Sequence, residues 1–151
     1  MIRQSKYYLF LQILSYLLVT MFLCAGAIYG ADYDSRLSGY EKDLLHSINQ
    51  YRAAKGLNTL SISKILQRLA INHSQYMDRE KSLNHDHFNE RFEKCGRTHC
   101  VENCGWNYMA PEDQLKAWIN SRGHNANLVN KDIKFVGISK IGAYVTFFAC
   151  D

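Results

Sequence analysis

Residues 61–80, "SISKILQRLAINHSQYMDRE", carry the strongest helical pattern in the chain. Apolar side chains recur along this stretch at steps of three or four residues, which places them on one face of an α-helix. The residues on that face are Ile62, Leu66, Leu69, His73 and Met77. A serine hydroxyl, at Ser61 or Ser63, can cap the first turn. Because His73 shares the apolar face, we interpret it as a hydrogen-bonded core histidine rather than a metal ligand.

Weaker helical patterns lie on both sides of this stretch. From Glu41 onward, apolar residues again share one helical face, and Gly56 marks the end of that segment. Residues 87–94, "HFNERFEK", favour a short helix. Pro111 is followed by two acidic residues, and proline and acids both favour the first turn of a helix. We expect that helix to end at residues 121–124, "SRGH".

The last part of the chain has the composition of β-strands. Residues 133–142 and 143–150 are rich in β-branched and aromatic side chains, and Gly142 supplies a turn between them. Residues 98–108 favour an extended segment. Helices, an extended segment, a helix and a strand pair, without internal repeats, predict a single α+β domain built in layers.

The first 31 residues indicate export. Arg3 and Lys6 precede an uncharged apolar run from Tyr7 to Ala31 that ends in small residues. This pattern is typical of a secretory signal peptide, and the alternative is an uncleaved membrane anchor formed by residues 7–31. Both interpretations place the remainder outside the cytoplasm. We therefore divide the chain into residues 1–31, a polar leader at 32–39 and a domain at 40–151, and expect a secreted or extracellular location.

The charge balance excludes one class of partner. The chain has 18 Lys+Arg and 14 Asp+Glu, and without residues 1–31, which hold two cations and no acids, 16 cations remain against the same 14 acids. So small an excess does not predict a nucleic-acid or acidic-membrane surface. We expect no nucleic-acid partner, and we expect a monomer.

The cysteines favour a domain that contains disulfide bonds. Four of the five lie after residue 31, namely Cys95, Cys100, Cys104 and Cys150. An even number in an exported chain favours two disulfides, in any of three connectivities. The alternative is a zinc site in which His99 joins the first three of these cysteines. Their C-x4-C-x3-C spacing is not a usual structural-zinc pattern, which favours the disulfides.

Four polar residues, in three segments, are candidates for a functional site. "LNHDHFNER", residues 83–91, contains His85 and His87 around an acid, and "CVENCGWN", residues 100–107, contains Glu102. Burial of an unpaired charge is unfavourable, so Glu102 needs a partner, and a histidine is a suitable one. His124 follows Gly123 at the end of the helix that contains Trp118, where it either joins the site or caps the helix. We expect Asp86 and Arg91 to pair with one another or to hold the loop around them.

Together these motifs resemble the CAP superfamily of cysteine-rich secretory proteins, antigen five and plant pathogenesis-related proteins, also called the SCP domain. The resemblance is to a short, microbial-type member and covers roughly residues 40–150. The matching pieces stand in the order that the family has: "INQYRAAKGLNTL" (48–60), "LAINHSQYM" (69–77), "LNHDHFNER" (83–91), "VEN" (101–103), "W..S.GH..NL" (118–128) and "FVGI" (135–138).

The resemblance implies an α-β-α sandwich, with a small, mainly antiparallel sheet between helical layers and a His/Glu cleft able to hold a divalent metal ion, zinc above all. It places His85, Glu102 and His124 in that cleft, with Asn103, Trp118 and Ser121 supporting them. Two departures weaken the ion site. Longer members carry an acid where this chain has Ser121, and a histidine where it has Lys134-Phe135. Three ligands and a water still suffice for zinc.

Three functions follow from these observations. The first is an extracellular binding or interaction module for a small apolar ligand such as a lipid or sterol, a peptide, or another extracellular protein. The second is a metal-assisted hydrolase, a peptidase, that uses the same cleft. The third is a purely structural extracellular domain. The serines lack an oxyanion motif of the G-x-S-x-G kind, so we assign no catalytic residue and favour the binding module over an enzyme.

Overall fold

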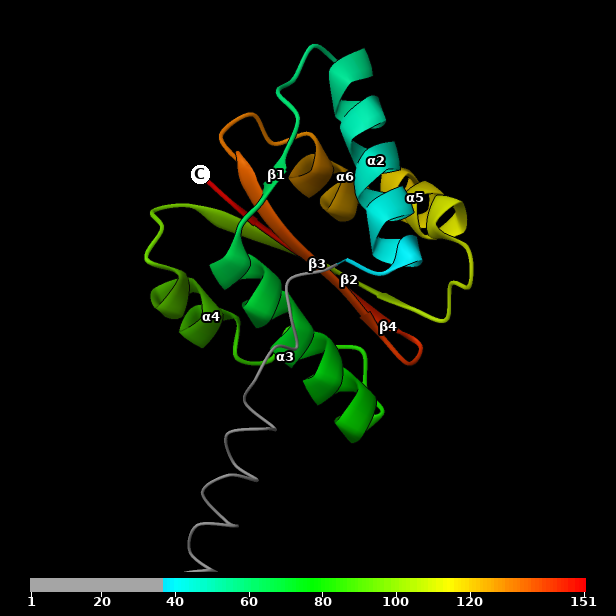
Figure 1. Ribbon diagram of the computed structural model, residues 1–151, viewed down its shortest axis with the longest axis vertical. Coiled ribbons are helices and arrows are strands. Elements are labelled where there is room, and N and C mark those ends of the chain that lie inside the picture. Colours follow the sequence, from blue (N-terminus) through cyan, green and yellow to red (C-terminus); the bar gives the residue numbers. More distant parts are fainter. Residues whose placement is uncertain (1–36) are drawn as a thin grey trace, which may run out of the picture. The chain divides into compact units, whose positions relative to one another are not determined.

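A four-stranded sheet in the order β1-β3-β4-β2 separates two layers of helices (Figure 1). This computed structural model describes residues 37–151, so the predicted signal peptide or anchor lies outside the described residues. The strands are β1 (Ser61–Ile62), β2 (Cys100–Trp106), β3 (Phe135–Ile141) and β4 (Tyr144–Cys150). β1 runs parallel to β3, whereas β4 is antiparallel to both β3 and β2. The predicted α-β-α sandwich with a mainly antiparallel sheet is confirmed.

The helices divide between the two faces of the sheet. α3 (Lys64–Glu80) and α4 (Phe88–Cys95) lie on one side, and α2 (Gly39–Ala54), α5 (Pro111–Asn120) and α6 (Arg122–Leu128) lie on the other (Figure 1). Within residues 37–151, no helix has the length and hydrophobicity that a membrane crossing requires.

The helix predicted at the opening stretch forms, but it begins later than its pattern suggests. Ser61 and Ile62 belong to strand β1, where they pair with Phe135 and Val136 of β3. Ser63 then precedes α3, without a side-chain capping bond. The apolar residue at position 62 therefore serves the sheet, which the local periodicity could not show.

Strand β4 connects the two halves of the core because all its residues are buried. Alternate side chains of a strand point to opposite faces. Phe147 packs with Trp118 of α5, with 6.1 Å between ring centroids, and Phe148 packs on the side of α3 and α4. The two helical layers are thus held to one strand.

Helix α3 lies unusually close to the sheet. A Cβ atom built on Gly137 of β3 would be 2.1 Å from the carbonyl oxygen of Leu66, so only glycine allows this approach. The Gln67 side chain also bonds both the N–H and the carbonyl oxygen of Ile138, at 2.9 and 2.6 Å. These contacts fix the position of α3, which carries His73, relative to the strands.

Strand β2 is the last strand in the sheet order, and side chains from the neighbouring helices bond its backbone. The Asn127 amide donates to the carbonyl oxygen of Glu102 at 3.0 Å, and the Trp118 indole donates to that of Cys104 at 3.1 Å. The Asn103 amide donates to the carbonyl oxygen of His124 at 3.0 Å. These hydrogen bonds hold α5 and α6 against β2.

The four cysteines within residues 37–151 form one disulfide, so the prediction of two among them is wrong. Cys100 bridges its register partner Cys150, whereas Cys95 and Cys104 are free and buried. Cys104 lies four residues along β2 from Cys100, which in a strand is about 13 Å. It is therefore out of reach of the other three sulfur atoms. The alternative zinc set fails for the same reason, and the His99 ring accepts a hydrogen bond from Asn130 instead.

Candidate functional site

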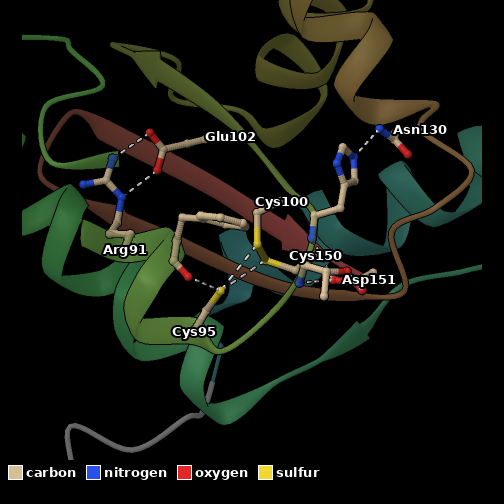
Figure 2. The surroundings of a disulfide bond; sticks show 10 residues. Arg91, Cys95, Cys100, Glu102, Asn130, Cys150 and Asp151 are labelled. Carbon is tan, nitrogen blue, oxygen red and sulfur yellow. Dashed lines mark hydrogen bonds and ion pairs between the residues drawn. A yellow bond between two sulfur atoms is a disulfide. The ribbon is translucent and has the colours of Figure 1, made fainter. Parts of the chain in front are cut away.

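A buried ion pair lies at the centre of the site. Glu102 of β2 and Arg91 of α4 are each 6% exposed. The Arg91 Nε donates to Glu102 Oε2, and its Nη2 donates to Oε1, both at 2.8 Å (Figure 2). A guanidinium bound to a carboxylate through two parallel hydrogen bonds is a strong and specific pair. The third Arg91 nitrogen, Nη1, donates to the carbonyl oxygen of Asp86 at 2.6 Å.

Two histidines also face Glu102. His85 Nδ1 lies 2.9 Å from Glu102 Oε1, on the solvent side, because the His85 side chain is 54% exposed. The His73 side chain is buried. Its Nε2 lies 3.7 Å from Glu102 Oε1 and 3.0 Å from the carbonyl oxygen of Asn84. Nε2 of His73 donates to Asn84, and its Nδ1 is buried without a partner among the described residues. The interpretation of His73 as a hydrogen-bonded core histidine is confirmed.

Cys104 completes the group around Glu102. Residues two apart on a strand share a face, and the Cys104 Sγ lies 3.7 Å from Glu102 Oε1 and 3.6 Å from His85 Nδ1. Burial and, to a smaller extent, the negative charge of Glu102 raise the pKa of the Cys104 thiol. The thiol therefore stays protonated and is not a nucleophile at neutral pH.

The charges determine which groups are ionised. Burial raises the pKa of Glu102, but the hydrogen bonds from His85 and Arg91 and the positive charge of Arg91 offset it, so the net pKa of Glu102 is lowered. Burial lowers the pKa of His73, and the charge of Glu102 opposes this only in part. At neutral pH the site therefore holds a carboxylate, a guanidinium and a neutral His73.

These shifts predict that the domain loses stability on acidification. The folded-state pKa of His73 is lowered, and so is that of His124, so below about pH 6.5 the unfolded chain binds protons that the folded protein does not. Glu102, whose folded-state pKa is also lowered, adds to the loss below about pH 4.3. We expect the free energy of unfolding to fall between pH 7 and pH 5, and again below pH 4. Urea unfolding at half-unit pH steps measures this dependence.

The variant His73→Gln serves as the control for this prediction. It removes one titrating group, so the fall between pH 7 and pH 5 should become shallower, whatever the variant does to absolute stability. A wild-type free energy of unfolding that stays constant from pH 7 to pH 5 would contradict the assignment of a neutral, buried His73.

The remaining predicted residues lie beside this group rather than in it. His124, Trp118 and Ser121 line an adjacent pocket of about 360 Å³ that also reaches Cys104. In residues 37–151 no hydrogen bond or ion pair links the His124 side chain to Glu102. His87 turns away and bonds Glu90 at 2.8 Å.

Two residues of the site were not predicted from the sequence, Gln114 in the pocket wall and Arg91 beside Glu102. Arg91 was expected only to pair with Asp86 or to hold the loop. It does hold the loop, through the backbone of Asp86, but its carboxylate partner is Glu102. The available signal was the requirement that a buried carboxylate have a cationic partner. Arg91 precedes Glu102 by eleven residues on a helix predicted from its own pattern, so the requirement alone does not single it out.

The pocket beside His124 combines apolar walls with one unsatisfied amide. Its walls include Leu83, Trp106, Tyr108 and Trp118, and both tryptophans of the chain are among them. Trp106 is 52% exposed and Leu83 is 51% exposed. Gln114 also lines the pocket, and its Nε2 and Oε1 are buried without hydrogen-bond partners among the described residues. Burial and, to a smaller extent, the charge of His85 lower the pKa of His124. The His124 ring is therefore neutral at pH 7.

The site does not fit a divalent ion as it stands. Donor atoms of His73, Glu102 and Cys104 lie within 4.8 Å of one another, close enough for one ion. Both oxygens of Glu102, however, already accept hydrogen bonds from the guanidinium of Arg91. A dication on the same carboxylate would lie against that fixed positive charge, which is unfavourable in a buried site. We therefore derive no function through a metal.

Comparison with known proteins gives one family. Residues 45–151 match the model described as the cysteine-rich secretory protein family, CAP. Among curated proteins of Bacillus subtilis (strain 168), YkwD is 28% identical over 119 residues, which are 71% of this chain and 44% of YkwD. The membrane protein YlbC is 27% identical over 118 residues, which are 70% of this chain and 33% of YlbC. The chain thus spans less than half the length of these relatives.

Solved structures share the fold. An extracellular protein containing an SCP domain from Bacillus anthracis str. Ames superposes with a TM-score of 0.70 at 21% identity, over 78% of this chain and 45% of that one. An outer surface protein from Borrelia burgdorferi superposes with a TM-score of 0.68 at 20% identity, over 73% of this chain and 90% of that one.

Proposed function

The chain belongs to the cysteine-rich secretory protein family, and from that premise we propose that it is an extracellular binding module that takes up a short peptide in the pocket beside His124. Its similarity to proteins described as extracellular or outer-surface supports the location. The pocket, with its unsatisfied Gln114 amide, supports the binding.

The Gln114 side chain is the observation that carries this proposal. Buried polar groups in proteins are almost always hydrogen-bonded, and an exception needs an explanation. Gln114 is 0% exposed, and its amide lies in the wall of a pocket whose other walls are mainly apolar, so a ligand reaches this acceptor and donor once the side chain turns toward the pocket. An extended residue of a peptide turns its own N–H and carbonyl oxygen to the same side, so one residue can satisfy both, as Ile138 does for the amide of Gln67. An acyl chain offers neither, and a sterol offers a single hydroxyl.

The apolar walls of the pocket suit an apolar side chain of the bound peptide. Ligand pockets are mostly apolar, with a few polar groups that fix orientation, and a volume near 360 Å³ lies within their usual range. Trp106 and Leu83 stand half exposed at this pocket. An aromatic or branched aliphatic side chain next to the bound peptide unit would bury them.

The geometry favours binding over hydrolysis. A general base needs a free carboxylate oxygen within reach of a water. Both oxygens of Glu102 already accept hydrogen bonds from Arg91, and Oε1 also contacts His85. Glu102 is also only 6% exposed, so a water has little access to the remaining lone pair of Oε2.

Tryptophan fluorescence tests the proposal directly, because both tryptophans line the pocket. We expect blocked dipeptides with a leucine or phenylalanine side chain to shift the emission in a saturable way. Fatty acid and cholesterol, added in separate titrations, are expected to leave it unchanged. Saturable binding of either lipid without peptide binding would overturn the assignment of the ligand.

The variant Gln114→Met separates recognition from folding. It removes two hydrogen-bonding groups, which for two neutral bonds is worth about a tenfold or greater loss of peptide affinity. The free energy of unfolding should stay level or rise, because an unsatisfied buried amide is lost. The same substitution at Gln50, an exposed residue of α2, is the matched control and should change neither quantity. Undiminished peptide affinity in Gln114→Met would contradict the proposed role of the amide.

A further inference from the structure

We infer that Cys95 and the Cys100–Cys150 disulfide form a thiol–disulfide exchange centre, in which the bridge moves from Cys100–Cys150 to Cys95–Cys100. Three sulfur atoms from α4, β2 and β4 gather at one point (Figure 2). The Cys95 Sγ lies 3.4 Å from that of Cys100 and 4.0 Å from that of Cys150. This inference concerns a different part of the molecule from the peptide pocket and does not depend on it.

The surroundings favour exchange within the chain over reaction with an external thiol. Cys95 is 6% exposed and Cys150 is completely buried, so small thiols have little access to either. A thiol held beside the disulfide has a high effective concentration instead. The Cys95 thiol bonds the carbonyl oxygen of Phe92 at 2.9 Å, within its own helix. Attack requires the Cys95 sulfur in line with the Cys100–Cys150 bond, so the side chain must first leave the position in which it bonds Phe92.

The exchange is balanced without any outside oxidant. The Cys95 thiol loses its proton to solvent, and the resulting thiolate attacks the Sγ of Cys100. The Cys95–Cys100 bond forms while the Cys100–Cys150 bond breaks, and its electron pair leaves with Cys150. Cys150 takes up a proton from solvent and becomes the free thiol. One disulfide and one thiol are present before and after.

The moved bridge would act on the candidate site. Cys95 follows Arg91 by one helical turn on α4, and Cys100 precedes Glu102 by two residues on the same face of β2. A Cys95–Cys100 bridge therefore ties together the two elements that carry the Arg91–Glu102 pair (Figure 2). At the same time it releases the end of β4 from β2.

The resting bridge is expected to predominate. It joins residues 50 apart, whereas the moved bridge joins residues five apart. Closing the longer loop restricts the unfolded chain more. The moved form is therefore expected to have a lower denaturation midpoint than the resting form. The resting bridge also joins register partners of β2 and β4, which the moved bridge would release, so we expect the moved bridge as a minor form in the wild type.

Peptide mapping of the intact protein tests this. Trypsin separates the three cysteines of the centre into residues 95–97, 98–116 and 141–151. After incubation in a glutathione buffer at pH 8, quenching with N-ethylmaleimide and digestion without reductant, two linked pairs are expected. The major pair joins 98–116 to 141–151, and a minor pair joining 95–97 to 98–116 should grow with incubation time. Cleavage after Glu102 distinguishes Cys100 from Cys104 within 98–116.

Two variants complete the experiment. In Cys150→Ser, the pair joining 95–97 to 98–116 is expected to become the dominant linked species. In Cys104→Ser, the other buried free cysteine, the wild-type pattern should persist. The wild type decides the outcome even where a variant folds poorly. If its Cys95 is fully alkylated at equilibrium and no 95–97 linkage appears, the exchange centre is overturned.

Discussion

Replacing Arg91 with alanine is expected to lower the free energy of unfolding by about 3–5 kcal/mol. The variant removes the guanidinium that bonds both oxygens of Glu102, while the carboxylate stays on β2, 6% exposed. A buried charge without its partner loses its solvation and gains nothing in return. His85 remains beside Glu102, but its side chain is half exposed and bonds only one oxygen. Urea denaturation at pH 7 measures the loss.

Two controls show whether that loss comes from the orphaned charge. The double variant Arg91→Met, Glu102→Leu removes both charges, and it should recover most of the stability because an apolar pair can replace a buried ion pair. The variant Arg79→Ala removes an arginine that is 67% exposed and paired with Glu80, and should cost under about 1 kcal/mol. If Arg91→Ala costs no more than Arg79→Ala, the ion pair does not stabilise the fold as we describe.

The second large effect is expected at Gly137, where alanine should lower the free energy of unfolding by about 1–3 kcal/mol or more. The added Cβ would meet the carbonyl oxygen of Leu66 at 2.1 Å and the backbone nitrogen of Gln67 at 2.5 Å. These are backbone atoms, so no side chain can move aside. Helix α3 must shift away from β3, which also stretches the Gln67 hydrogen bonds to Ile138.

Gly123 supplies the matched control for this prediction. It lies in α6, and a Cβ built there meets nothing within 4 Å. Because alanine is a better helix former than glycine, Gly123→Ala should be neutral or stabilise by up to about 1 kcal/mol. Thermal or urea unfolding of both variants compares them. Equal stability of the two alanine variants would show that α3 is not held as closely as the structure places it.

Local patterns were sufficient for most of the fold. The 3.6-residue periodicity located α3, Pro111 located the start of α5, and the turn at Gly142 located the β3–β4 hairpin. Each of these signals lies within a short stretch of chain. Strand β1 was missed because its two residues are extended only through pairing with Phe135 and Val136, more than 70 residues away.

The candidate site was predictable only in part, for the same reason. The requirement that a buried carboxylate have a partner favoured a histidine, and the resemblance to the family placed His85 with Glu102, which the structure brings into contact. The choice of Arg91 as the main partner depends on where α4 packs, and a sequence pattern does not give that. The disulfide pairing likewise depends on the register of β2 against β4, which places Cys100 opposite Cys150. Counting cysteines gives their number but not their neighbours.

The bonds from Trp118 and Asn127 to β2 have a consequence for how copies of this protein behave when they are crowded. The unpaired backbone groups at an open margin of a sheet can pair with strands of other molecules and so start fibrous aggregation. Here two carbonyl groups of the outermost long strand are already occupied from within the molecule. At the opposite margin, β1 covers only the first two residues of β3, and the Gln67 and Glu41 side chains bond the backbone of Ile138 and Lys140 beyond it. Neither margin offers a template for intermolecular sheet growth, so the folded domain should resist polymerisation at high concentration.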